Sequence, residues 1–174
     1  QSALHESFPL RIFRNTAPAL LHSTFISGAQ NPYRTDFPSV GVCLLINNKN
    51  FYSSTRMGKR HGTDVDAAAV KKTFENLGYT MMVFQDLTVK EMKEKLQSVA
   101  EEDHSKRASF VCVILSHGDE GVIFGTDGCE ELDVLTRYFK GDKCKTLVGK
   151  PKLFFIQVSL GSFELPCVRN ARHK

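Results

Sequence analysis

The sequence lacks several features that would place it in a familiar class of protein. No apolar run approaches the roughly eighteen residues that a membrane-spanning helix needs, and no basic stretch followed by an apolar one suggests a signal peptide. The net charge is +4, but Lys and Arg do not gather into the stripe that is typical of a nucleic-acid interface. No internal repeat is present. We therefore expect a soluble domain that binds neither membrane nor nucleic acid.

The five cysteines lack the spacing of a metal or disulfide framework. Their odd number and the absence of a CxxC pair argue against a disulfide scaffold and against a zinc site. Cys43 and Cys112 lie within apolar runs and are interpreted as buried core thiols. This usage favours a reducing, cytoplasmic setting. The first residue is Gln1 and not Met, so we expect the chain to be a fragment.

Short apolar runs alternate with amphipathic stretches from residue 39 onward. The runs predict strands at 39–47, 79–85, 109–116 and 151–157, and the amphipathic stretches predict helices at 62–78, 88–103 and 131–139. Thr63 with Asp66, and Thr88 with Glu91, have the capping-box spacing of a helix N-terminus. Segment 122–128 predicts a small hairpin. This alternation indicates βαβ units, and hence an α/β fold with a mostly parallel sheet flanked by helices.

The ends of two predicted strands carry the candidate chemistry. In parallel sheets the ligand crevice lies outside the carboxyl ends of the strands. His117 follows the apolar run 109–116, and Gly118 comes next. An imidazole titrates near neutrality, and a glycine lets a backbone N–H approach a reacting oxygen, so this pair suits acid–base catalysis. The alternative is a loop histidine without a special role.

Four stretches carry a resemblance to a known protease family. They are INNKNF (46–51), RHGTDVDA (60–67), the long segment 101–128 and GKPKLFFIQ (149–157). From about residue 36 to residue 157 the chain resembles the large subunit of an executioner caspase. The resemblance implies the three-layer αβα caspase fold, here incomplete. It also implies a cysteine endopeptidase of apoptosis that cuts protein substrates after aspartate and needs no metal or cofactor.

The resemblance also implies roles for individual residues. His117 matches the catalytic histidine, and Gly118 matches the glycine whose N–H helps to bind the oxyanion. Arg60 and Gln157 match residues of the pocket for the substrate aspartate. A guanidinium presents a planar fork to a carboxylate, which suits Arg60 to that task. Without the resemblance, Arg60 would be interpreted as a surface charge.

The chain departs from the family after Gln157. The family continues with Ala-Cys-Arg-Gly, whereas this chain has Val158-Ser159-Leu160-Gly161, so Ser159 stands at the position of the nucleophilic cysteine. A serine hydroxyl is a far weaker acid than a thiol, and a caspase site is arranged around a thiolate. We therefore predict negligible peptidase activity. Cys167 lies eight residues further on and is interpreted as an incidental thiol.

These observations predict three regions. Residues 1–35 are expected to be a divergent, mostly disordered segment, 36–157 a caspase large-subunit domain, and 158–174 a divergent tail. Gln-Val-Ser at 157–159 can be encoded by an exon end and intron start, so the tail is hypothesised to be translated intron. The acidic linker and the small subunit of the family are missing from this sequence, so the last strand is expected to keep an uncovered edge.

Two classes of function remain open from the sequence. The first is a caspase enzyme, whose partners would be a small subunit and a second heterodimer. The second is a non-catalytic fragment that pairs with caspase small subunits and interferes with the active enzyme. A nucleotide-binding, flavodoxin-like domain would suit the sheet pattern, but the first strand is not followed by a glycine-rich phosphate loop.

Overall fold

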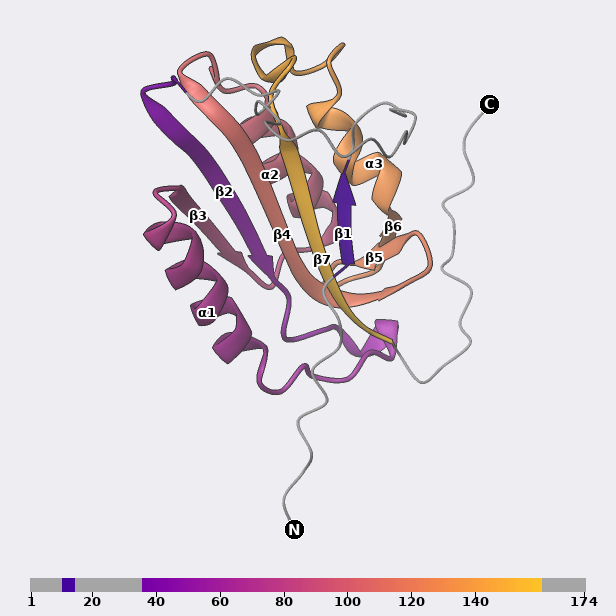
Figure 1. Ribbon diagram of the computed structural model, residues 1–174. Coiled ribbons are helices and arrows are strands. Elements are labelled where there is room, and N and C mark those ends of the chain that lie inside the picture. The colour runs from indigo at the N-terminus through magenta and orange to yellow at the C-terminus, as the bar shows by residue number, and fades with distance from the viewer. Residues whose placement is uncertain (1–10, 15–35, 161–174) are drawn as a thin grey trace, which may run out of the picture.

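Seven strands form one mixed sheet in the computed structural model, which describes residues 11–14 and 36–160 (Figure 1). The strands are β1 (Arg11–Arg14), β2 (Ser39–Asn47), β3 (Thr80–Gln85), β4 (Arg107–Asp119), β5 (Val122–Phe124), β6 (Cys129–Glu131) and β7 (Lys152–Leu160). The main order is β1-β7-β4-β2-β3, in which β2, β3, β4 and β7 run parallel and β1 runs antiparallel. The α/β fold with a mostly parallel sheet is confirmed.

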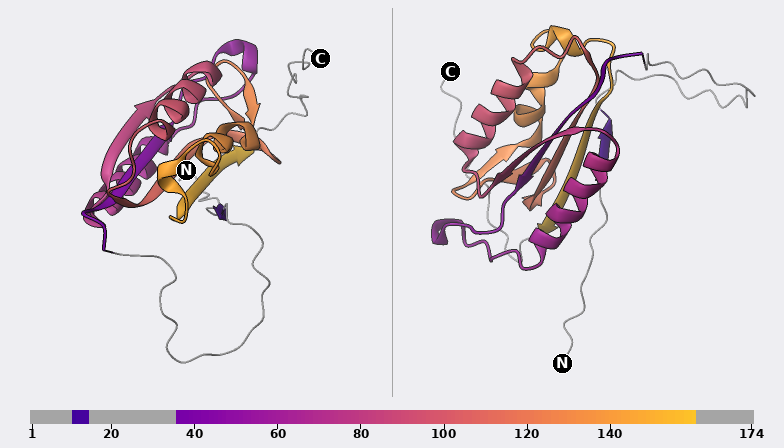
Figure 2. Two further views of the ribbon diagram at one scale, coloured as in Figure 1. Left: turned by 90° about the horizontal axis from the view of Figure 1, so that it is seen from above. Right: turned by 90° about the vertical axis from the view of Figure 1, so that its left-hand side faces the viewer.

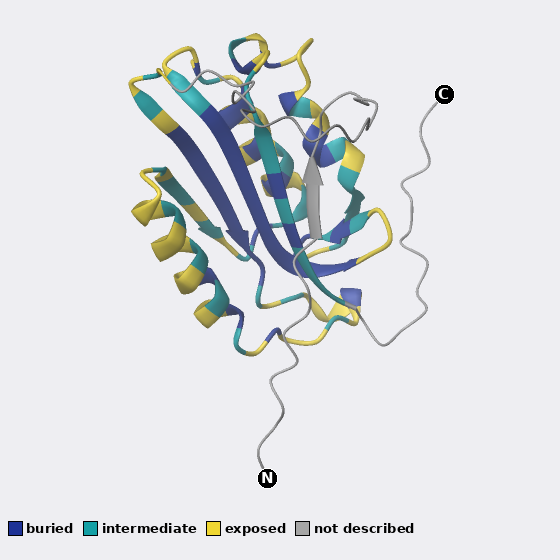
Figure 3. Ribbon diagram, viewed as in Figure 1, coloured by how far each residue is buried: buried dark blue, intermediate teal, exposed yellow. Residues whose placement is uncertain are grey.

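Helices cover both faces of this sheet, as the right-hand view of Figure 2 shows. They are α1 (Thr63–Asn76), α2 (Val89–Ala100) and α3 (Leu132–Thr136), with short 3-10 turns η1 (Ser53–Thr55), η2 (Arg137–Phe139) and η3 (Lys145–Leu147). One core cluster packs α1 against β2 and β4, and a larger one packs α2, α3 and η2 against the opposite face. This is the expected three-layer arrangement, and the central strands β2 and β4 are almost wholly buried (Figure 3).

An aromatic cluster anchors the larger core. Phe110 of β4 stacks on Phe139 of η2 with ring centroids 4.1 Å apart, and Phe154 of β7 meets both rings edge-on. All three side chains are buried. Stacked and edge-on aromatic pairs add about 1 kcal/mol each to the burial of their surface. The cluster therefore joins β4, β7 and the segment after α3, which sets the register of the two strands that lead to the candidate site.

Two predicted strands are longer in the structure than in the sequence analysis. β4 continues past residue 116 to Asp119, because Gly118 pairs with Ile123 on one side and with Leu160 on the other. β7 continues past Gln157 to Leu160 for the same reason. His117 therefore lies inside a strand, and the expectation that it follows the strand is wrong.

One helix start was predicted correctly and the other was not. Thr88 accepts a hydrogen bond from the Glu91 amide and Glu91 bonds the Thr88 amide, so the capping box of α2 is confirmed. At α1 the N-cap is Gly62, without a side-chain cap. The Thr63 hydroxyl is engaged elsewhere, donating to the side chain of Asn47. The predicted helix 131–139 is divided into α3 and η2, and the predicted hairpin forms as β5 and β6.

The segment before residue 36 contributes one element that the sequence analysis did not predict. β1 pairs antiparallel with the outer edge of β7, with Arg11 opposite Ile156 and Arg14 opposite Leu153. This half of the β7 edge is therefore covered, and the expectation that it is uncovered is wrong. The remainder of the predicted disordered segment, and residues 161–174 of the predicted tail, lie outside the described residues.

Across residues 36–160, the helices are all too short and too polar to span a bilayer.

Candidate active site

The candidate site lies at the carboxyl ends of the parallel strands β2, β4 and β7. β2 and β4 are neighbours, and the strands that follow them in the chain, β3 and β7, lie on opposite sides of this pair. From β2 the chain crosses one face through α1 to β3, and then returns over the other face through α2 to β4. The carboxyl ends of β2 and β4 are thus neighbours whose following segments diverge, which opens a crevice in sheets of this kind. His117 of β4, Ser159 of β7 and Arg60, in the segment after β2, meet at this end.

His117 is buried, with 8% of its surface exposed, and both of its ring nitrogens face backbone carbonyls. Nε2 lies 2.8 Å from the Gly58 oxygen and Nδ1 lies 3.1 Å from the Ser159 oxygen. A neutral imidazole has one N–H, so it donates to one of these carbonyls at a time, whereas an imidazolium donates to both. The Phe51 ring packs at 4.7 Å between centroids. The carbonyls and the Phe51 ring fix the orientation of the imidazole.

Gly118 occupies a position that admits no side chain. A Cβ built there would lie 2.5 Å from Val158 Cγ1 and 2.7 Å from the Val122 carbonyl oxygen. These distances are far below ordinary van der Waals contact. Glycine therefore lets β5 and β7 approach β4 from both sides at the residue after His117.

Arg60 is buried at the same end of the sheet, with 7% of its surface exposed. Its guanidinium donates to the Thr63 hydroxyl at 2.7 Å, to the Asn48 carbonyl at 3.2 Å and, through Nε, to Ser159 Oγ at 3.3 Å. Burial lowers the pKa of Arg60 from its usual value, which nearby Asp66 partly offsets. The interpretation of Arg60 as a surface charge is therefore wrong. Among residues 36–160, no carboxylate forms a salt bridge with Arg60. A desolvated guanidinium of this kind is suited to bind a carboxylate from a ligand.

Ser159 contacts both His117 and Arg60, but its hydroxyl does not face the histidine. Its backbone oxygen faces His117, and its side-chain oxygen accepts from Arg60. Gln157 lies two residues earlier on β7, opposite Leu115, and is half-buried. Within residues 36–160, the Gln157 side chain forms no hydrogen bond with the other candidate residues. The structure thus brings together three of the predicted site residues and Gly118, and leaves Gln157 adjacent.

Two buried asparagines support the site and were not predicted as functional. Asn47 and Asn48 end β2 with 1% and 0% of their surfaces exposed. Asn47 accepts from Thr63, which in turn holds Arg60. Asn48 accepts from the Leu87 amide and donates to the Phe124 carbonyl, so it joins the loop after β3 to β5. Two consecutive asparagines at the end of an apolar run could have indicated this supporting role, because buried side-chain amides need hydrogen-bond partners.

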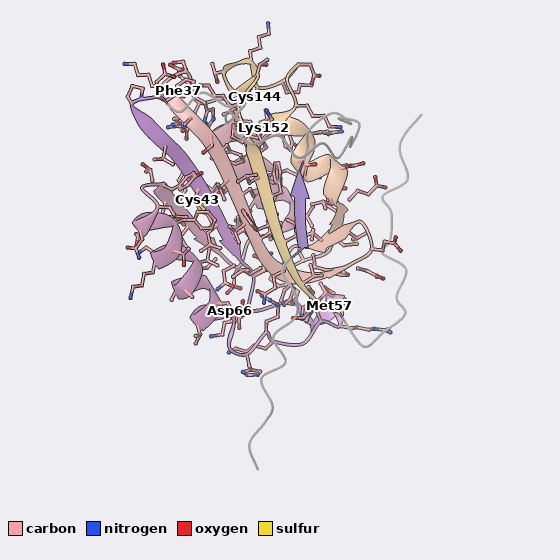
Figure 4. All side chains as sticks on the ribbon, in the orientation of Figure 1. Phe37, Cys43, Met57, Asp66, Cys144 and Lys152 are labelled. Atoms are coloured by element: carbon pink, nitrogen blue, oxygen red, sulfur yellow. The ribbon has the colours of Figure 1, made fainter. Side chains whose placement is uncertain are left out.

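The described cysteines lie away from this site. Cys43 and Cys112 are buried in the middle of β2 and β4, and burial raises the pKa of Cys43 to about 12 and that of Cys112 well above its usual value. Cys144 is buried near the opposite end of the sheet from Met57, which adjoins Gly58 (Figure 4). Cys129 takes part in a disulfide, which the sequence analysis did not expect. Cys167 is outside the described residues. The described ranges contain no cluster of three metal-ligating side chains.

Comparison with known proteins shows the family to which this chain is similar. A family model described as "Caspase domain" matches residues 40–172. The chain is 58% identical over 135 residues to caspase-3 of Mesocricetus auratus, covering 78% of this chain and 48% of that protein. It is 54% identical over 138 residues to caspase-3 of Bos taurus, covering 79% and 50%, and 57% identical over 135 residues to that of Mus musculus, covering 78% and 48%.

This chain belongs to the caspase family. It spans about half the length of the curated relatives it matches. The family match runs past Gln157 to residue 172, so it includes most of the segment that the sequence analysis separated as a divergent tail. The boundary at residue 158 and the translated-intron hypothesis stay predictions.

Proposed function

We propose that this chain is the histidine-bearing part of a caspase-type cysteine endopeptidase of apoptosis, and that with Ser159 it does not hydrolyse peptides. In this proposal the complete enzyme cleaves after aspartate and acts in the cytoplasm. Its other parts are a small subunit and a second heterodimer. The observation that carries the proposal is the arrangement of a buried imidazole, a buried guanidinium and residue 159 at one end of the sheet.

The proposed chemistry assigns each group one task. A thiol at position 159 would lose its proton to His117, whose ring is oriented by the Gly58 carbonyl. The N–H groups of Gly118 and of the nucleophile's own residue would bind the oxyanion of the tetrahedral intermediate. Arg60 and Gln157 would hold the carboxylate of the substrate aspartate, for which a buried guanidinium has matching charge and shape.

The contacts of the Ser159 hydroxyl support the proposed inactivity of the serine form. General-base activation needs the base within hydrogen-bond reach of the proton that it removes. The Ser159 hydroxyl oxygen instead accepts from Arg60 at 3.3 Å, and both nitrogens of His117 face carbonyl oxygens. In this proposal the same guanidinium of Arg60 would also bind the substrate carboxylate. Neither contact increases the nucleophilicity of the hydroxyl.

A two-part experiment tests the proposal. Purified chain is incubated with a fluorogenic peptide that has aspartate before the scissile bond, and turnover equal to that of His117→Ala is expected. If the unaltered chain hydrolyses the peptide and both His117→Ala and Ser159→Ala abolish that hydrolysis, the proposed inactivity is refuted. In the second part, iodoacetamide alkylation of Ser159→Cys is compared with the Ser159→Cys/His117→Ala double variant. Faster alkylation when His117 is present is expected, because imidazole favours the thiolate. Equal rates would refute the pairing of residue 159 with His117.

The second candidate function is a non-catalytic partner of caspase small subunits. The observation in its favour is the serine at the nucleophile position within an otherwise ordered site. A pull-down with an isolated small subunit, followed by inhibition of the corresponding active caspase, tests this function. Absence of binding would remove it, whereas peptide hydrolysis by the chain itself would favour the enzyme.

A further inference from the structure

Asp86 directly follows β3 and has an unusual backbone conformation. Among the described residues, it and Arg56 are the two non-glycine residues with a positive φ, which is 53° at Asp86. Residues with a side chain adopt this left-handed region rarely, and they keep it where the surrounding structure holds them, frequently beside a functional site. β2 and β3 end side by side (Figure 1), and the Asp86 N–H donates to the Asn47 carbonyl at 3.0 Å. Asp86 therefore lies at the same end of the sheet as the candidate site.

The Asp86 carboxylate holds residues 48–51, which we call the post-β2 segment. Its Oδ1 accepts from the backbone N–H of Lys49 at 2.7 Å and from that of Asn50 at 2.8 Å, and its Oδ2 accepts from the Asn50 side-chain amide at 2.6 Å. Burial raises the pKa of Asp86, but the hydrogen bonds from Asn50 and Lys49 outweigh this effect and hold the pKa below its usual value. The carboxylate is therefore ionised at neutral pH, and hydrogen bonds to an ionised acceptor are the strong ones.

The post-β2 segment contacts both buried groups of the candidate site. The Asn48 carbonyl accepts from the Arg60 guanidinium at 3.2 Å, and the Lys49 carbonyl accepts from the Arg60 backbone N–H at 3.0 Å. The Phe51 ring packs against the His117 ring with 4.7 Å between centroids. A displacement of this segment would therefore move hydrogen-bond acceptors of Arg60 and the aromatic ring that packs on His117 at the same time.

Other contacts anchor the two ends of the segment but not its middle. The buried Asn48 side chain fixes one end, and the Tyr52 N–H donates to the Thr126 carbonyl at 2.8 Å just past the other. Between these anchors, the backbone N–H groups that form hydrogen bonds within the described residues both donate to the Asp86 carboxylate. Phe51 lies in this interval, so the position of its ring depends on Asp86.

We propose that Asp86 is a positioning residue of the candidate site, whose carboxylate holds the post-β2 segment against His117 and Arg60. This role rests on the proposed function, since it concerns the placement of the same two groups. Groups that bind or react are effective only when neighbouring side chains fix their orientation. Without the carboxylate, the middle of the segment is released between its anchors, and the His117 ring loses the aromatic partner that limits its orientation.

Three variants separate this role from a general contribution to stability. Asp86→Gly removes the carboxylate and suits the positive φ, so it adds no backbone strain. Asp86→Asn tolerates the same φ and keeps one acceptor oxygen. Asp103→Gly is the matched control, because the Asp103 carboxylate accepts from the N–H and the hydroxyl of Ser105 at 2.8 and 2.9 Å. Asp103 precedes the amino end of β4, whereas His117 lies near the carboxyl end of that strand.

Nuclear Overhauser contacts between the Phe51 and His117 rings test the placement in the full chain and do not depend on any activity. The contacts should be retained in Asp103→Gly, weakened in Asp86→Asn and lost in Asp86→Gly, although urea unfolding should show that both glycine variants are less stable. Contacts that stay at full strength in Asp86→Gly, or an equal loss in Asp103→Gly, would overturn the proposal. Should Asp86→Gly not fold, undiminished contacts in Asp86→Asn would overturn it.

Iodoacetamide alkylation of Ser159→Cys gives a second readout, in the proposed chemistry. Added Asp86→Gly should reduce the alkylation rate toward that of Ser159→Cys/His117→Ala, and should have no further effect once His117→Ala is present, because Asp86 acts through the imidazole. An unchanged rate, or an equal reduction in both backgrounds, would overturn the positioning role and leave the proposed function intact. Equal rates with and without His117 would instead refute the proposed function, and the ring contacts would still decide the role of Asp86.

Discussion

Gly118→Ala is the substitution whose effect the structure predicts most directly. The new methyl carbon would lie 2.5 Å from Val158 Cγ1, 3.1 Å from Val158 Cβ and 2.7 Å from the Val122 carbonyl oxygen. Rotation of the Val158 side chain removes the first overlap only. The Val122 oxygen belongs to the backbone of β5, which is held by pairing with Asp119, so relief requires the hairpin to shift.

The expected cost can be worked from these contacts. Overpacking a well-packed site costs about 1–3 kcal/mol, and a backbone overlap places Gly118→Ala near the upper end, at about 3 kcal/mol. Alanine reduces the entropy of the unfolded chain relative to glycine, but this gain is below about 1 kcal/mol. Val158→Ala alone should cost about 1 kcal/mol, since Val158 is only partly buried. In the double variant, alanine at position 158 removes the overlap with Val158 Cγ1 and keeps the contact with Cβ. The double variant should therefore cost about 1 kcal/mol less than the sum of the two single variants.

Urea unfolding followed by far-UV circular dichroism measures all four free energies of this cycle. The coupling between the two positions requires that β7 continue past Gln157 beside β4, with Val158 opposite Ser116. Additivity of the two substitutions within about 0.3 kcal/mol would refute the contact between Gly118 and Val158. A neutral Gly118→Ala would refute the close approach of β5 and β7 altogether.

Two further predictions concern buried titratable groups. The His104 ring is buried between the Val99 carbonyl and the Arg107 guanidinium. Burial, together with the charges of Arg107 and Lys150, lowers the pKa of His104. These effects outweigh the hydrogen bond to Val99 and the charge of Glu102, which raise it. The folded state then binds fewer protons than the unfolded state, so stability is lost as the pH falls through the unfolded value of about 6.5. The urea midpoint should drop between about pH 7.5 and pH 5.5, and an equal drop in His104→Gln would contradict this account. Cys43, whose pKa burial raises to about 12, should resist iodoacetamide in the native protein and react in urea, as read by peptide mass mapping; rapid native labelling would show that β2 is accessible.

Local signals predicted the elements whose determinants are close in sequence. The Thr88–Glu91 capping box was readable because both partners lie within one turn of the same helix. The strands β2 and β4 were readable because burial on both faces leaves an uninterrupted apolar run. The N-terminal cap of α1 could not be predicted in this way, because the Thr63 hydroxyl donates a hydrogen bond to Asn47, sixteen residues away. The distant partner satisfies the hydroxyl that local spacing had assigned to the helix end.

By itself, the sequence determined the α/β class, the family and the chemical types at the site, because these depend on apolar periodicity and on motifs that are contiguous in the chain. Tertiary structure alone decided that Arg60 is buried, that the hydroxyl of Ser159 is held by this guanidinium and not by His117, and that β1 lies on β7. Each of these contacts joins residues about a hundred or more positions apart, or forms only once a strand edge exists to be covered. No local pattern encodes such contacts, since the partner is brought within reach only by the folding of the whole sheet.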